Sequence, residues 1–184
     1  VLDVALASGF RSLRRFNALF RARYRMPPSR LRHDAAPATL PSSMHFELTY
    51  RPPYDWDSLL AFLSARAVAG VEAVDATGYR RTLAIERNGA LASGWIGVAK
   101  SPKRHTLRVD VAASLAPVVP AVLARVRHAF DLACDPAPIA ARLGTLAARR
   151  PGLRVPGSCD GFELAVRAVI GQQVSVAAAR TLLG

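Results

Sequence analysis

Four segments of alternating apolar and polar residues most constrain the fold of this chain. They are HFELTYR (45–51), YRRTLAIER (79–87), LASGWIGVA (91–99) and HTLRVDV (105–111). A period of two places the apolar side chains on one face of a β-sheet. Asn88-Gly89, between the second and third segments, is typical of a type I′ turn that joins antiparallel strands. The pattern therefore predicts an antiparallel sheet with one buried face.

Apolar residues at helical spacing predict helices that cover this face. The first helix is expected after Asp55, with the apolar residues Leu59, Leu60, Phe62, Leu63 and Val68. The second is expected in PVVPAVLARVRHAFDL (117–132), with the apolar residues Val119, Val122, Leu123, Val126 and Phe130. Antiparallel strands with helices on one face make an α+β domain. We expect its core to come from these residues.

An arginine-rich helix is predicted near the N-terminus. Its apolar residues recur at helical spacing, Ser12 is placed as an N-cap, and Pro27-Pro28 ends it. These apolar residues are Leu13, Phe16, Leu19, Phe20 and Tyr24. A shorter apolar stretch before Gly9 predicts a preceding helix, so the pair is typical of a helix-turn-helix. The following HDAAPATLPSS (33–43) has no periodicity and reads as a linker.

The C-terminal third is predicted to be helical. PAPIAARLGTLAARRPGL (136–153) is rich in Ala and Leu, and GFELAVRAVIGQQVSVAAARTLLG (161–184) follows it. Asp160 and Glu163 have the spacing of a capping box. Gly171 is expected to end that helix as a C′ glycine, and Ser175 to cap the next. The residues expected on one buried face are Phe162, Val166, Val169 and Ile170.

Focused positive charge indicates an anionic partner. The chain has a net charge of +12 and a pI near 11.2, and residues 1–33 carry eight arginines against Asp3 alone. Concentrated arginine neutralises phosphates well, which favours nucleic acid as the partner. The alternative is a solvated charged face.

Cysteine usage and hydropathy indicate the compartment in which the protein is expected. Cys134 and Cys159 have no C-x-x-C spacing and lie far from the four histidines, so we expect free thiols and no zinc site. The sequence has no secretory n-region or h-region and no apolar run of membrane-spanning length. We therefore expect a cytoplasmic protein that does not bind membranes.

Two parts of the sequence resemble known families. ALASGFRSLRRFNALFRARYRMPPSRLR (5–32) resembles the second helix-turn-helix of AraC-type transcription regulators. Three later stretches resemble bacterial 3-methyladenine DNA glycosylase II of the helix-hairpin-helix superfamily. They are YRPPYDWDSLLAFLSARAVAGVEAV (50–74), RHTLRVDV (104–111) and ARRPGLRVPGSCDGFELAVRAVIGQQVSVAAA (148–179). The whole resembles the junction of an adaptive-response regulator fused to that glycosylase.

The resemblance implies a domain organisation. Residues 1–33 would be the second half of an AraC-type domain, 34–43 a linker, and 44–130 a TBP-like α+β domain. Residues 131–184 would begin an all-α helix-hairpin-helix domain. The family hydrolyses the glycosidic bond of alkylated bases in double-stranded DNA without a metal or organic cofactor. Its catalytic aspartate lies downstream of the matched stretch, so we expect a fragment with no catalytic residue in residues 1–184.

The resemblance also places residues at the DNA. Phe62 matches a position that lines the alkylated-base pocket, although its spacing among leucines alone favours the core. Gln173 falls where the best-known members place a leucine wedge that enters the duplex, and Gly171 and Gln172 form the corner that presents it. The alternative is that Gln172 and Gln173 are only polar residues of a tight helix connection.

Four arginines are candidates for DNA contacts in the helix-turn-helix. Arg11, Arg14 and Arg15 begin the expected recognition helix, where arginine reads guanine, and Arg21 is expected at phosphates. Promoter DNA is therefore a second possible partner. Solvated surface charge is the alternative for each arginine.

A different class of function also fits the sequence. The chain could be a non-catalytic DNA-binding regulator whose α+β module recognises a partner or ligand. A Gly-rich hairpin followed by an aspartate in the continuation of the reading frame would discriminate the two. A basic module for RNA or membranes ranks far behind, because no RNA-binding signature or amphipathic anchor is present.

Overall fold

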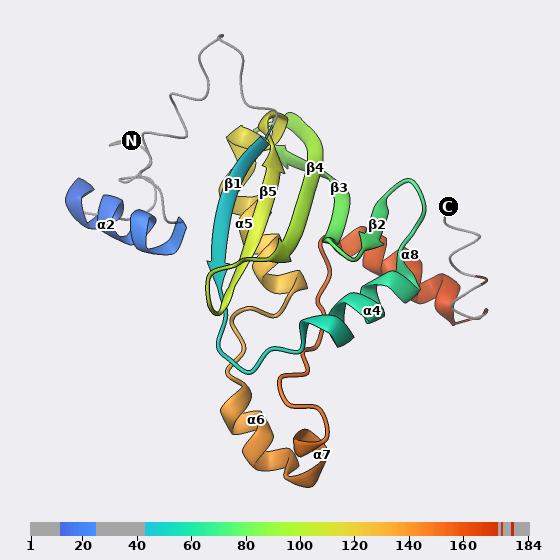
Figure 1. Ribbon diagram of the computed structural model, residues 1–184. Helices are drawn as coiled ribbons and strands as arrows, with labels where there is room; N and C mark the ends of the chain where they lie inside the picture. Colours follow the sequence, from blue (N-terminus) through green and yellow to red (C-terminus); the bar gives the residue numbers. More distant parts are fainter. Residues whose placement is uncertain (1–11, 25–42, 173, 175–177, 179–184) are drawn as a thin grey trace.

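The computed structural model (Figure 1) describes residues 12–24, 43–172, 174 and 178. Within these ranges, five strands form one antiparallel sheet in the order β1-β5-β4-β3-β2. The strands are β1 (Ser43–Thr49), β2 (Glu72–Asp75), β3 (Gly78–Arg87), β4 (Ala90–Lys100) and β5 (Thr106–Ala112). The four predicted strands are present. β2 was not predicted, because its four residues, EAVD, are too short and too charged to alternate clearly.

The turn between β3 and β4 confirms the predicted hairpin. Asn88 and Gly89 have φ angles of 53° and 76°, both in the left-handed region that a type I′ turn requires. The register follows from this turn, since Arg87 pairs with Ala90 and Thr82 with Trp95. Alternate residues of β3 therefore face the core.

Helices and one 3-10 helix (η1) complete the described fold. They are α2 (Leu13–Tyr24), α4 (Trp56–Arg66), η1 (Ala113–Val118), α5 (Val119–Ala129), α6 (Pro136–Leu143), α7 (Thr145–Ala148) and α8 (Gly161–Gly171). Asp55 caps α4 by accepting the Ser58 N–H at 3.0 Å. Val68, expected inside this helix, lies beyond its end. Its carbonyl accepts the N–H groups of Val71 and Glu72, which turns the chain into β2.

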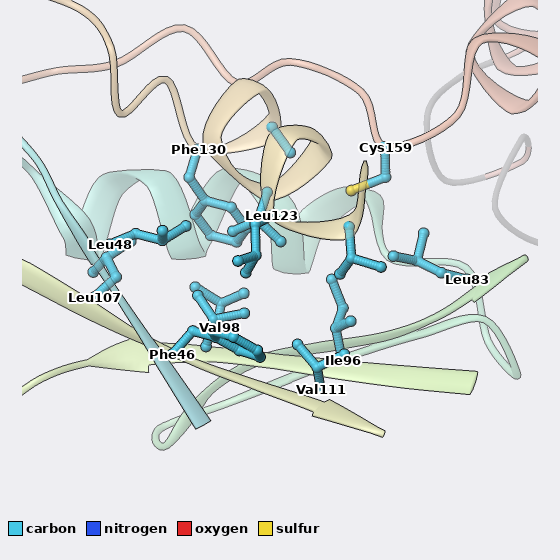
Figure 2. Close-up of a cluster of buried hydrophobic side chains, with 14 of the residues drawn as sticks. Phe46, Leu48, Leu83, Ile96, Val98, Leu107, Val111, Leu123, Phe130 and Cys159 are labelled. Carbon is cyan, nitrogen blue, oxygen red and sulfur yellow. The ribbon is translucent and has the colours of Figure 1, made fainter. Parts of the chain in front are cut away.

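The core lies between the inward face of the sheet and α5 (Figure 2). Phe46, Ile96 and Val98 from the strands meet Leu123 and its neighbours from α5, and all are fully or almost fully buried. These side chains sit at the positions that the alternation predicted. Burial of each removes apolar surface worth about 1.5–3 kcal/mol, so this layer is the main source of stability.

Aromatic rings join α4 and the sheet to the end of α5. Phe130 stacks on Trp56 with the ring centroids 5.9 Å apart and meets Tyr79 edge-on at 5.6 Å. Phe130, Trp56 and Tyr79 are all buried. Both cysteines are free thiols, with Cys159 buried and Cys134 half-buried.

The arginine-rich helix α2 begins as predicted. Ser12 precedes it, and its Oγ accepts the Arg15 N–H at 3.4 Å. Phe16 is buried and α2 contacts β1, but Leu13 and Leu19 are exposed. The apolar stripe is thus narrower than the sequence predicted. The expected preceding helix and residues 33–42 of the expected linker lie outside the described residues, whereas Ser43, the last residue of the expected linker, begins β1.

The segment between α7 and α8 crosses the body of the domain and is tied down by Arg154. This side chain is buried, and it donates to the carbonyls of Arg51 at 2.5 Å, Pro53 at 2.9 Å and Cys134 at 3.1 Å. Gly152 has a φ of 82°, and a Cβ there would lie 2.5 Å from the Tyr54 nitrogen. These contacts fix the position of the segment that leads into α8.

Candidate functional site

Phe62 lies on the surface of α4. Trp56 and Leu59 of the same helix are buried, whereas Phe62 is 41% exposed, so the prediction that it belongs to the core is wrong. The helix turns this side chain away from the face that packs on the core. The Arg66 guanidinium lies 3.7 Å from the centroid of the Phe62 ring. Phe62 therefore makes a cation–π contact within its own helix.

Helix α8 ends at Gly171, with Gln172 as its C-terminal cap. Asp160 caps the helix by accepting the Glu163 N–H at 2.8 Å, which confirms the first half of the predicted capping box. The second half does not form, because the Asp160 N–H donates to the Ser158 Oγ at 3.1 Å and the Glu163 carboxylate pairs with arginines. Gly171 does not act as a C′ glycine with positive φ. It is the last residue of α8, and the helical conformation continues to Gln172. Gly171 and Gln172 are exposed, while Gln173 and Ser175 lie outside the described residues.

The apolar residues of α8 do not form the buried face that the sequence predicted. Phe162 and Val169 are 81% and 70% exposed, and Val166 and Ile170 are half-buried. Charged side chains of α8 make contacts with the rest of the domain. These come from Glu163 and Arg167, one turn apart on the helix.

Four charged side chains join α8 to β2 and β3. Glu163 accepts from Arg81 at 2.5 Å and pairs with Arg167 at 2.5 Å. Arg167 also donates to Glu72 at 2.5 Å and to the Arg66 carbonyl at 2.8 Å. We refer to Glu72, Arg81, Glu163 and Arg167 as the α8 charge cluster. Charged side chains that are buried or half-buried are tolerated only when they are paired, and each of these four has a partner.

Glu72 is held ionised within this cluster. Burial alone would raise the pKa of Glu72, but hydrogen bonds from Tyr79, Arg167 and the Val68 N–H hold it below the usual 4.5. The Tyr79 hydroxyl donates to Glu72 at 2.6 Å. Burial raises the pKa of Tyr79, so its hydroxyl stays protonated as a donor.

Two hollows in the described residues lie near α8 and α6, and Phe62 does not line either of them. One, of about 580 Å³, lies beside the start of α8 and is lined in part by Arg81, Trp95, Arg125 and Glu163. The other, of similar volume, is apolar and lies between α6, α7 and the segment 151–155. The role of Phe62 in a base pocket stays a prediction.

Among the candidate DNA-binding arginines, Arg14, Arg15 and Arg21 lie on α2 and are exposed. Arg11 is outside the described residues. Their exposure leaves the guanidinium groups accessible to a partner. In the described ranges, no three His, Cys, Asp or Glu side chains gather in a way that could hold a metal ion. The same ranges hold no helix of the length and hydropathy needed to cross a membrane.

Comparison with known proteins identifies the family. Residues 45–160 match the AlkA N-terminal domain. The match covers nearly all of the sheet and the helices from α4 to α7, and it ends just before α8. The chain belongs to the AlkA family. An α+β domain with a five-stranded antiparallel sheet agrees with this assignment.

Curated AlkA relatives match different lengths of the chain. DNA-3-methyladenine glycosylase 2 of Escherichia coli is 44% identical over 137 residues, which are 74% of this chain and 47% of that protein. A probable bifunctional transcriptional activator/DNA repair enzyme AlkA of Mycobacterium tuberculosis is 35% identical over 193 residues, which cover 99% of this chain and 38% of that protein. The chain thus spans less than half the length of these relatives.

The lowered pKa of Glu72 predicts a pH-dependent stability for this AlkA domain. The ionised carboxylate stabilises the folded state, so its contribution is complete above pH 4.5 and is lost as the pH falls through the lowered pKa. We expect Glu72→Gln to lower the free energy of unfolding by about 2 kcal/mol at pH 7. The difference from wild type should shrink below pH 4.5. Urea unfolding at several pH values measures it, and a difference that is constant from pH 7 to 3 would contradict the assignment.

Proposed function

We propose that this chain is the N-terminal part of a DNA glycosylase that excises alkylated bases. The match of residues 45–160 to the AlkA N-terminal domain carries the proposal. The names of the relatives, a DNA-3-methyladenine glycosylase and a probable DNA repair enzyme, support it. We place this activity in the bacterial cytoplasm, at the nucleoid, on double-stranded DNA.

The proposed reaction starts with rotation of the damaged nucleotide out of the duplex. This step costs a few kcal/mol, and a side chain that fills the gap offsets the cost. We assign that role to Gln173, presented by Gly171 and Gln172. Glutamine fills less apolar space than leucine but can hydrogen-bond the orphaned base.

Phe62 would then contact the extruded base. N-alkylated purines carry positive charge, and an exposed aromatic ring attracts a cation by a cation–π contact. Arg66 already occupies this ring face, so the ring geometry suits a planar cation. We propose that the base exchanges with the Arg66 guanidinium on Phe62.

Cleavage needs a carboxylate that stabilises the oxocarbenium-like sugar. Several of the described carboxylates have structural partners, such as Asp110 with His45 at 2.6 Å and Asp135 with Arg51 at 2.5 Å. We therefore propose that residues 1–184 do not supply the catalytic group, and that an aspartate C-terminal to them does.

Base release from methylated DNA tests this function. We expect the full-length natural protein to release 3-methyladenine and residues 1–184 alone to release none. Chromatography of the free base measures both. Absence of release by the full-length protein would favour the alternative, a non-catalytic DNA-binding regulator. Release by residues 1–184 would show that the catalytic group lies within them.

The exposed arginines of α2 support a second DNA contact, to promoter DNA through an AraC-type helix-turn-helix. The alignment of this segment with a relative named a probable bifunctional transcriptional activator favours it. We expect Arg14→Ala with Arg15→Ala to weaken the salt-sensitive duplex binding of residues 1–184 and to reduce the slope of log K against log salt by about 2.

Fluorescence anisotropy at several salt concentrations measures this slope. The control pair is Arg80→Ala with Arg108→Ala, which removes two exposed arginines from the sheet. An equal effect of the two pairs would show that the α2 arginines contribute only net charge.

A further inference from the structure

We propose that Arg167 is a positioning residue. It fixes the exposed side of α4 that carries Phe62 relative to the C-terminal end of α8 at Gln172. The proposal rests on the proposed function, which assigns these two places to the extruded base and to the duplex. Arg167 itself touches neither the base nor the duplex in this account. Its effect passes through α4 and α8.

One guanidinium contacts three elements. Arg167 belongs to α8, and its Nη2 lies 2.5 Å from both the Glu72 carboxylate of β2 and the Glu163 carboxylate of α8. Its Nη1 donates to the carbonyl of Arg66, the last residue of α4, at 2.8 Å. The planar fork of arginine can serve all three acceptors at once, whereas lysine offers a point charge.

Arg167 lies about one helical turn from each proposed contact. Along α4, Arg66 comes four residues after Phe62, and its side chain stacks on that ring. Along α8, Gly171 comes four residues after Arg167. A helical turn is rigid over this length, about 6 Å. A shift of the guanidinium therefore moves the two surfaces relative to each other.

Arg81 holds the cluster from the opposite side. It is buried on β3, it donates to Glu163 at 2.5 Å, and Glu163 is thereby held between Arg81 and Arg167. Since the apolar side chains of α8 are largely exposed, these charged contacts determine where the helix lies. Base extrusion and filling of the gap occur together, so the two surfaces must be correctly spaced at the same moment.

The alternative is that the cluster only stabilises the fold. Buried ion pairs are weak evidence for stability, because apolar side chains of similar volume often replace them without loss. If so, replacing the Arg167 guanidinium should reduce the unfolding temperature, DNA binding and base release together. Loss of positioning should instead reduce base release in protein that is folded and bound to DNA.

The test compares Arg167→Met and Arg167→Lys in the full-length natural protein. The probe is a methylated duplex, and the measurements are the single-turnover rate of base release at saturating protein, the Kd and the unfolding temperature. We expect Arg167→Met to lower the rate about tenfold or more, with less than a threefold change in Kd. Arg167→Lys should recover only part of the rate, because it cannot reach all three acceptors.

Arg80→Met is the matched control, since Arg80 neighbours Arg81 on β3 but forms an exposed ion pair with Asp75. It should leave the rate unchanged. An unchanged rate of base release in Arg167→Met would overturn the proposal. A parallel fall in rate, DNA affinity and unfolding temperature that Arg167→Lys fully restores would also overturn it.

Hydrogen exchange separates failure of this proposal from failure of the proposed function. If wild-type protein releases no base, the proposed function fails, and exchange in residues 1–184 still tests the coupling. Arg167→Met should accelerate exchange at the end of α4, around Phe62 to Arg66, by about tenfold relative to Arg80→Met. Equal exchange in the two variants would overturn the positioning role.

Discussion

Arg154→Met is expected to lower the free energy of unfolding of residues 1–184 by about 3 kcal/mol or more. The guanidinium is buried and donates to three main-chain carbonyls, those of Arg51, Pro53 and Cys134. Methionine has a similar length but donates no hydrogen bond, so these carbonyls would lose a charged donor. Each lost hydrogen bond to a charged group costs about 1.5–3 kcal/mol, and partial hydration of the carbonyls reduces the sum.

Arg150→Met is the control for Arg154→Met. Arg150 is exposed and lies four residues earlier in the same segment, so its replacement should change the free energy of unfolding by less than about 0.5 kcal/mol. Equilibrium unfolding in urea measures both variants. Similar losses in the two would show that the hydrogen bonds of Arg154 do not tie the segment to the domain.

Phe62→Ala is expected to lower the rate of 3-methyladenine release by the full-length natural protein about 30-fold, with little loss of stability. A desolvated cation–π contact is worth about 2 kcal/mol, which corresponds to this factor. Phe62 is 41% exposed, so its truncation leaves no cavity in the core. Phe62→Leu separates the contribution of the aromatic ring from that of apolar volume, because leucine keeps apolar volume but has no ring.

The comparison with Leu59→Ala tests this assignment. Leu59 is buried on the core-facing side of α4, so its truncation should cost about 2–5 kcal/mol of stability and leave the release rate of the remaining folded protein unchanged. Equal release rates for Phe62→Ala and wild type would remove Phe62 from the base pocket.

The sheet could be predicted from the sequence because its signals are local. Alternation depends on neighbouring residues, and Asn88-Gly89 specifies its turn through the φ angles that these two residues tolerate. β2 was not predicted because its backbone pairs with β3, and because the side-chain partners of Glu72, Tyr79 and Arg167, lie outside the strand, Arg167 being 95 residues later. No periodicity within EAVD contains that information.

The orientation of α8 could not be predicted from its own pattern. The spacing of Phe162, Val166 and Val169 predicts a helix, and the helix is present, but those side chains do not determine its packing. Its packing depends on Glu163 and on Arg81, 82 residues apart. One signal in the sequence indicated this contact. Arg81 lies between Tyr79 and Leu83 on the inward face of β3, and a charged residue on a buried face predicts a buried partner.

For the candidate site, the sequence located Phe62 on a helix but placed it in the core by spacing, whereas the resemblance placed it at the base. Its exposure removes the core interpretation. The roles of Gln173, Gln172 and the α2 arginines stay predictions. The partner of the charge cluster, the Arg66 carbonyl, is a main-chain atom and leaves no trace in the sequence.

Fluorescence of 2-aminopurine measures the extrusion of a nucleotide by this protein. The probe is a duplex that carries 2-aminopurine beside a stable abasic analogue, titrated with the full-length natural protein. Because unstacking relieves quenching of this base, we expect a severalfold rise in fluorescence on binding, and a smaller rise with Gln173→Gly. Binding with no change in fluorescence would contradict the proposed extrusion.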